Sequence, residues 1–186
     1  WCQKKDIILV LDESFIDFST EHPTFLDNAL LEQYDKLVVV KSISKSYGVP
    51  GLRLGILATS NSLLMTNLRR ALAIWNINSF GEFFLQILGK YEKPYQQAMD
   101  AFREERERFV KQLNNIPYLR VLPSEANYVL CEVKESHTPR ELAIQLLKKY
   151  SILIKDCTKK CNAPYIRLAV RDAKDNDQLI KALKEL

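Results

Sequence analysis

The stretch that decides the fold is Ser42-Ile-Ser-Lys-Ser-Tyr-Gly-Val-Pro-Gly-Leu-Arg-Leu-Gly55. It contains one lysine, Lys45, which stands among hydroxyl side chains and is followed by three of the five glycines in the chain. The apolar run Leu37–Val40 comes just before it, and a short run of this kind is typical of a buried strand. A loop of hydroxyls, glycines and an arginine after a strand can hold a phosphate beside a reactive amine.

The neighbouring segments indicate an α/β protein. Ile7–Leu11 is a continuous apolar run, which predicts a strand buried on both faces of a parallel sheet, and Leu54–Ala58 predicts a third strand. Asp12 follows the first run, at the sheet edge where ligands of open α/β sheets bind. We therefore expect residues 1–110 to form part of a large domain with a mostly parallel sheet, ending in a charged connecting helix over residues 93–114.

The last third of the chain has a different pattern of elements, which predicts a small α+β domain over residues 111–186. Thr138 is the expected N-cap of its first helix, and the last helix is expected to start at Asp175 or Asn176. Its expected strands are 119–122, 127–133, 152–155 and 165–170, and its expected helices are 139–150 and 175–186.

Composition narrows the class of protein. The net charge is +4 with acids and bases interspersed, which argues against a nucleic-acid partner. Since the chain has no run of about 18 apolar residues, we expect no membrane span. The four cysteines are too sparse for a disulfide framework, which favours a reducing cytoplasm. Cys157 and Cys161 lack a second Cys or His pair, so we expect no metal site.

Several other side chains are expected to have ordinary structural roles. Phe80, Phe83 and Phe84 follow helical spacing, which predicts packing in the core. His22 and His137 stand in polar loop contexts, which predicts that both are exposed.

Lys45 has three interpretations: a surface lysine, a phosphate-binding charge, or a lysine that forms a Schiff base. A P-loop places its lysine after the glycines, whereas Lys45 precedes them, so that interpretation fails. The surface interpretation explains neither the hydroxyls of Ser42 and Ser44 nor Arg53. A Schiff-base site needs exactly such phosphate ligands, and an acid such as Asp12 to face a pyridinium nitrogen. It also needs an arginine for a substrate carboxylate, and Arg167 and Arg171 are the candidates.

At these positions the chain resembles the class I/II aminotransferases of fold type I, which use pyridoxal 5'-phosphate (PLP). The resemblance implies that Lys45 holds PLP and moves a proton, that Asp12 faces the ring nitrogen, and that Ser42, Ser44 and Arg53 bind the cofactor phosphate. The motifs that carry it occur in the family's order and are Leu11–Asp17, Ser42–Gly55, Glu125–Leu130 and Tyr165–Arg171.

The resemblance also implies roles in substrate binding. Arg167 matches the arginine that binds the substrate α-carboxylate, and Asn127 lies in the segment that approaches the substrate. Two roles are open for Arg171: it binds a substrate phosphate, or it pairs with Asp172 or Asp175 on the surface.

Within the family, the chain is most similar to histidinol-phosphate aminotransferases and threonine-phosphate decarboxylases. Phe15 stands where aminotransferases have a tyrosine that hydrogen-bonds the cofactor's ring oxygen, and Arg171 stands where histidinol-phosphate enzymes tend to have glycine. Both departures resemble the decarboxylases, and aminotransferase-like domains fused to nucleotidyltransferases. The open functions are a PLP-dependent aminotransferase for an amino acid or phosphorylated amine, a decarboxylase-type lyase, and an inactive fragment of a larger enzyme.

The resemblance covers only the second half of a family member. No counterpart of the first half precedes Trp1, so we expect the N-terminal half of the same protein to be missing and much of the cofactor pocket with it. The resemblance further implies a homodimer.

Overall fold

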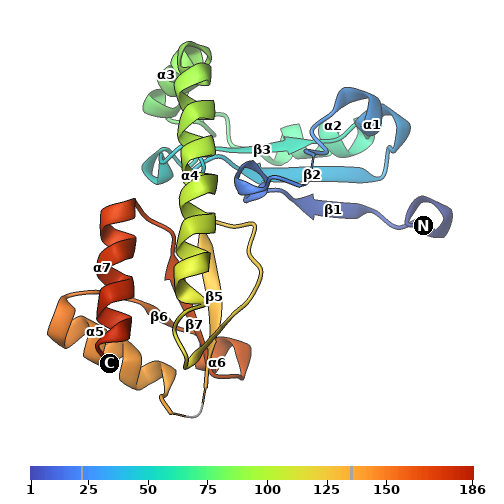
Figure 1. The fold of residues 1–186 in the computed structure, drawn as a ribbon. Coiled ribbons are helices and arrows are strands. Elements are labelled where there is room, and N and C mark those ends of the chain that lie inside the picture. The colour runs from blue at the N-terminus through green and yellow to red at the C-terminus, as the bar shows by residue number, and fades with distance from the viewer. Residues whose placement is uncertain (22, 135) are drawn as a thin grey trace. The chain divides into compact units, whose positions relative to one another are not determined.

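The structure is a computed structural model that describes residues 1–21, 23–134 and 136–186 (Figure 1). The chain forms two compact units, Trp1–Met99 and Asp100–Leu186, which are divided within helix α4 (Glu92–Leu113). The domain boundary that the sequence predicts, near residue 110, lies in this same helix and stays a prediction.

The first unit is built on a three-stranded sheet with the order β1-β2-β3. Its strands are β1 (Leu9–Asp12), β2 (Leu37–Ser42) and β3 (Gly55–Ala58). β1 is parallel to β2 and places Asp12 opposite Val40, while β3 is antiparallel and places Gly55 opposite Ser42. A side chain at Gly55 would lie 3.3 Å from the carbonyl oxygen of Lys41, so glycine permits this close approach. The carboxyl ends of β1 and β2 therefore meet at one edge.

The helices of this unit begin at polar caps. In α1, α2 and α3 the side chains of Asp27, Asn61 and Asn78 each accept a hydrogen bond from a backbone N–H in the first turn, which satisfies a donor that the helix itself leaves unpaired. The helices are α1 (Asn28–Gln33), α2 (Ser62–Ala71) and α3 (Ser79–Ile87), and the 3-10 turns are η1 (Gln3–Lys5), η2 (Ile16–Phe18), η3 (Pro50–Leu52) and η4 (Leu88–Tyr91).

Two expectations about burial in this unit are wrong. The run that becomes β1 was predicted to be buried on both faces, yet Val10 is 58% exposed, whereas Val39 of β2 is fully buried. Phe80 and Phe83 were predicted to be core but are 79% and 60% exposed, and Phe84 is half-buried against the ring of Tyr47. Apolar spacing identifies the side chains that favour burial but does not supply an element that covers them.

The second unit is a four-stranded antiparallel sheet with the order β4-β5-β7-β6. Alternation along β5 and β7 buries one set of side chains and leaves the other set, which includes Tyr128 and Arg167, half-buried or exposed. The elements are β4 (Leu119–Val121), β5 (Tyr128–Val133), α5 (Pro139–Tyr150), β6 (Lys155–Asp156), α6 (Thr158–Cys161), β7 (Tyr165–Ala169) and α7 (Ala173–Lys184).

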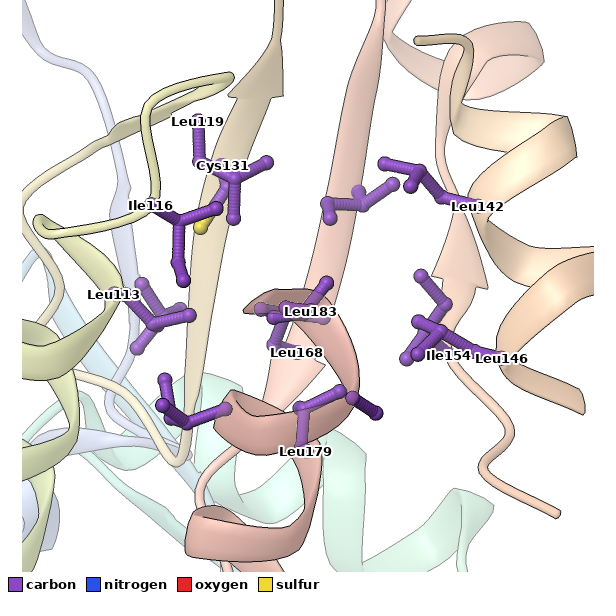
Figure 2. Packing of buried hydrophobic residues seen from close by; sticks show 14 of the residues in the cluster. Leu113, Ile116, Leu119, Cys131, Leu142, Leu146, Ile154, Leu168, Leu179 and Leu183 are labelled. Atoms are coloured by element: carbon purple, nitrogen blue, oxygen red, sulfur yellow. The ribbon is translucent and has the colours of Figure 1, made fainter. Parts of the chain in front are cut away.

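The core of this unit lies between the sheet and its helices (Figure 2). Leu113 at the end of α4, Leu146 of α5 and Leu183 of α7 are fully buried, and they pack in one cluster with Cys131 and Leu168 of the central strands. This cluster confirms the predicted α+β character of the C-terminal part.

The ends of the helices test three further expectations. Thr138 caps α5 as predicted, and it forms a capping box with Glu141. Helix α7 begins at Ala173, before the predicted start at Asp175 or Asn176, because the side chain of Asp172 caps it by accepting from the backbone N–H of Asp175. His137 is half-buried with its ring centroid 4.2 Å from that of Tyr118, so its predicted exposure is wrong. The prediction for His22 lies outside the described residues.

Within residues 1–21, 23–134 and 136–186, no helix combines the length and apolar character needed to cross a membrane. The same residues contain no group of three or more His, Cys, Asp or Glu side chains arranged to hold a metal ion. Cys2, Cys131, Cys157 and Cys161 are free thiols.

Candidate active site

The carboxyl ends of β1 and β2 open onto a cleft of about 350 Å³. Asp12 ends β1, Ser42 ends β2, and Ser44 and Arg53 come from the loop that follows β2. These four predicted site residues all line the cleft. The parallel register of β1 and β2 brings them together, because parallel strands end at the same edge of a sheet.

Asp12 is held as a carboxylate by its own turn. The hydroxyl and the backbone N–H of Ser14 donate to Asp12 Oδ1 at 2.5 and 2.9 Å. These two hydrogen bonds, with a smaller contribution from the charge of Lys45, lower the pKa of Asp12 below its usual value. The Ser14 hydroxyl in turn accepts from the backbone N–H of Ser42 at 3.0 Å. Asp12 is therefore ionised at neutral pH and is tied to the end of β2.

Lys45 sits on a tight turn of the loop. The backbone N–H of Gly48 donates to the carbonyl of Lys45, and Gly48 adopts a φ of 66°, which favours glycine. The side-chain amine lies 4.7 Å from the centroid of the Phe15 ring, over its face. An aromatic face attracts a cation, so Phe15 holds the ammonium group close to the segment that follows Asp12.

An ion pair between Asp17 and Lys41 supports this segment, and sequence reasoning missed it. The side chains are only 18% and 11% exposed, and the pair joins the η2 turn to β2. The signal in the sequence was a lysine directly after the apolar run of β2, because a charge in a buried strand requires a partner. Ser14 was also missed, although a serine two residues after an aspartate often closes a turn onto that carboxylate.

The phosphate candidates form a second cluster in the cleft. The hydroxyl oxygens of Ser42 and Ser44 lie 2.7 Å apart, and Ser44 is buried. Arg53 adopts a left-handed backbone with a φ of 56°, an uncommon conformation for a residue with a Cβ, and donates to the carbonyl of Pro50 at 3.1 Å. A guanidinium carries five N–H donors, so this contact leaves others for an anion.

The residues of this cleft fit PLP. Two hydroxyls and a guanidinium suit its phosphate, and the ionised Asp12 suits its ring nitrogen. Lys45 is not among the residues that line the cleft; its amine, which lies over the Phe15 ring, has the chemistry that an aldehyde requires.

The predicted substrate-binding residues belong to the second unit. The guanidinium of Arg167 lies 5.1 Å from the centroid of the Tyr128 ring on the neighbouring strand. The carbonyl of Asn127 accepts from the backbone N–H of Val170 at 3.1 Å. The side chain of Arg171 forms an ion pair with Asp175, while its role toward a substrate phosphate stays a prediction.

Lys155 is a further cation that sequence reasoning missed. It lies on β6 directly opposite Arg167 on β7, and directly opposed residues point to the same face of a sheet. Both side chains are exposed. The signal was available, because Lys155 ends the strand predicted over 152–155.

Known proteins resemble this chain over nearly its whole length. The profile of the aminotransferase class I and II family matches residues 1–183. Threonine-phosphate decarboxylase of Salmonella typhimurium is 35% identical over 194 residues, which cover 100% of this chain and 50% of that protein. CMP-5'-(3-aminopropyl)phosphonate synthase of Streptomyces rubellomurinus is 34% identical over 184 residues, which cover 97% of this chain and 29% of that protein.

A solved structure shows the same fold. The histidinol-phosphate aminotransferase of Clostridium acetobutylicum matches with a TM-score of 0.89 and 28% identity, covering 99% of this chain and 55% of that one. The chain thus spans between 29% and 55% of the length of these three relatives. The predicted resemblance and fold class are confirmed. The chain belongs to the aminotransferase class I and II family, whose members have fold type I and depend on PLP.

Proposed function

We propose that this chain carries the cofactor-anchoring lysine of a PLP-dependent aminotransferase that acts on an amino acid or a phosphorylated amino compound. The observation that carries the proposal is the cleft at the carboxyl ends of β1 and β2, which brings Asp12 together with Ser42, Ser44 and Arg53. Lys45 follows Ser44 directly in the same loop. When bound, PLP supplies a ring that accepts electrons from the substrate carbon whose bond is broken.

The chain's own residues divide the remaining work. Lys45 would hold the cofactor through its aldehyde and, as a free amine, would move a proton for the substrate. Asp12 would keep a proton at the ring nitrogen, since it is ionised and can accept a hydrogen bond. Ser42, Ser44 and Arg53 would hold the phosphate and so orient the ring. Homodimerisation and a cytoplasmic location stay predictions.

The pair of Arg167 and Lys155 supports a substrate with two anionic groups. Like charges at directly opposed positions destabilise a sheet, and anionic groups bound to the two side chains would offset that repulsion. Arg167 is the proposed ligand of the α-carboxylate, and Lys155 would then bind a second anion such as a phosphate. This favours a phosphorylated amino acid or amine over an uncharged side chain.

A second candidate function is decarboxylation of a phosphorylated amino acid. Two observations favour it: Phe15 lies under the Lys45 amine without a hydroxyl to offer the cofactor, and a threonine-phosphate decarboxylase is among the relatives at 35% identity. The products separate the two functions. Transamination yields a keto acid and the amine form of the cofactor, whereas decarboxylation yields carbon dioxide and leaves the cofactor unchanged.

The test of the proposed anchor is covalent labelling. We expect PLP to give a visible absorbance band with the protein, and borohydride reduction to fix the cofactor's mass on the peptide that contains Lys45. Lys45→Ala should lose both signals, while Lys90→Ala, which removes an exposed lysine of the same unit, should keep them. A band and a label that survive in Lys45→Ala would refute the proposal.

A further inference from the structure

We propose that Glu105 and Arg106, two consecutive residues of α4, are positioning residues. They hold the loops that carry Asn127 and Arg171 in the positions needed to bind the substrate. All four residues belong to the unit Asp100–Leu186. The inference rests on the proposed function, because it assumes that these loops border the substrate. The family resemblance does not mark either residue of α4.

Arg106 holds the first loop, which joins β4 to β5. Its side chain is buried to 4% exposure in the middle of α4. Nη1 donates to the carbonyl of Ala126 at 3.2 Å, and Nη2 lies 3.6 Å from a carboxylate oxygen of Glu125. Burial lowers the pKa of Arg106, which reflects the cost of withdrawing this charge from water. Apolar residues of similar volume often pack such a site at least as stably, so fixing Ala126 is a better reason for the arginine than stability.

Glu105 holds the second loop, which joins β7 to α7, through Asn176. The Asn176 side chain is 2% exposed and donates to Glu105 Oε1 at 2.7 Å. The same amide forms hydrogen bonds with both backbone groups of Arg171. Its oxygen accepts from the N–H at 3.0 Å, and its nitrogen donates to the carbonyl at 2.9 Å. Arg108 donates to both carboxylate oxygens of Glu105, which lowers the pKa of Glu105 and keeps it an ionised acceptor.

The two loops are also bonded to each other. The backbone N–H of Val170 donates to the carbonyl of Asn127, so the bonded path runs from Arg106 through Ala126 and Asn127 to Val170 and Arg171. From Arg171 the path continues through the side chains of Asn176 and Glu105 back to α4. The side chains in this closed ring are those of Glu105, Arg106 and Asn176, and buried or ionised groups of this kind are costly to leave unpaired. Neither loop can shift without breaking one of these contacts.

The experiment compares Glu105→Ala with Glu105→Gln in the PLP-loaded protein, and takes Glu104→Ala as the matched control. Glu104 precedes Glu105 on the same helix and its side chain is exposed. We expect Glu105→Ala to raise KM for the amino substrate about tenfold, since a small misplacement of binding groups can cost up to about a hundredfold. Glu105→Gln retains an oxygen acceptor for Asn176 and should restore most of the loss. The cofactor absorbance should be unchanged in all three variants.

A second measurement does not depend on catalysis. Hydrogen exchange of the Arg171 amide should quicken in Glu105→Ala and stay unchanged in Glu105→Gln and Glu104→Ala. An unchanged KM in Glu105→Ala with normal PLP binding would overturn the inference while leaving the proposed function intact. Equal losses in Glu105→Ala and Glu105→Gln, or an unchanged amide exchange rate, would overturn it as well. A wild-type protein that does not label at Lys45 would instead refute the proposed function, and the exchange data would still decide whether the ring exists.

Discussion

The two units of the chain are held together in different ways. In Asp100–Leu186 one buried cluster includes side chains of every long element, whereas the buried cluster under the sheet of Trp1–Met99 consists of Leu31, Leu37 and Val39. The first unit orders its site through polar contacts instead, such as the ion pair of Asp17 with Lys41. The residues proposed for the cofactor are thus in the unit with the smaller core, so bound PLP should stabilise that unit more than the other.

The largest expected effect tests this difference in cores. Leu146 is fully buried in the second unit, and Leu146→Ala should lower the free energy of unfolding by about 2–5 kcal/mol. Val10 lies on β1 and is 58% exposed, and Val10→Ala should change that free energy by less than about 0.5 kcal/mol. Urea denaturation followed by circular dichroism measures both. Equal losses in the two variants would mean that β1 is covered in solution, and the comparison of cores would fail.

The same difference explains how much of the fold could be predicted from the sequence. The strands and helices of the second unit follow local rules, such as the capping box at Thr138, and their alternation matches the buried face. The exposure of Val10 and Phe80 could not be predicted, because apolar composition records a preference for burial and not the presence of a covering element.

The residues of the candidate site also differ in how well the sequence predicts them. Lys45 and Asp12 were predicted because their loop and their strand end carry recognisable chemistry within a few residues. Glu105 and Arg106 were not, because on a charged amphipathic helix they look like solvated residues. Their partners lie far along the chain, so only the tertiary structure reveals that Arg106 is buried and that Glu105 binds Asn176.

A smaller effect is expected at Arg53, where the first unit combines a strained backbone with a phosphate donor. Arg53→Gly should raise the dissociation constant of PLP about tenfold, because a charge-assisted bond to phosphate is lost. The free energy of unfolding without cofactor should not fall, because glycine adopts the left-handed φ of 56° without a steric penalty. PLP titration and urea denaturation measure the two quantities.

The control for Arg53 is Arg70→Gly. Arg70 is an exposed residue within α2, where glycine costs about 1 kcal/mol of stability and no phosphate contact is proposed. We therefore expect the opposite pattern, a less stable protein with unchanged PLP affinity. A drop in the stability of Arg53→Gly as large as that of Arg70→Gly would contradict the strain argument.

The smallest expected effect concerns the hydrogen bonds from Ser14 that keep Asp12 ionised. Ser14→Ala removes the hydroxyl that contributes most to the lowered pKa of Asp12, so that pKa should move up toward its usual value of 3.8. A carboxylate with a depressed folded pKa stabilises the fold above the unfolded pKa, and this contribution is lost as the pH falls through the folded pKa. In Ser14→Ala the loss should therefore begin at a higher pH, within the acidic range below neutrality.

An NMR titration of the Asp12 carboxyl carbon in the protein without cofactor measures this shift directly. Ser62→Ala, at an exposed serine that begins α2, should leave the titration unchanged. If Ser14→Ala also leaves it unchanged, the backbone N–H of Ser14 and the charge of Lys45, rather than the hydroxyl, set the state of Asp12. A shift of the Asp12 titration in Lys45→Ala would then assign part of the lowered pKa to the amine, and no shift would assign it to the backbone N–H.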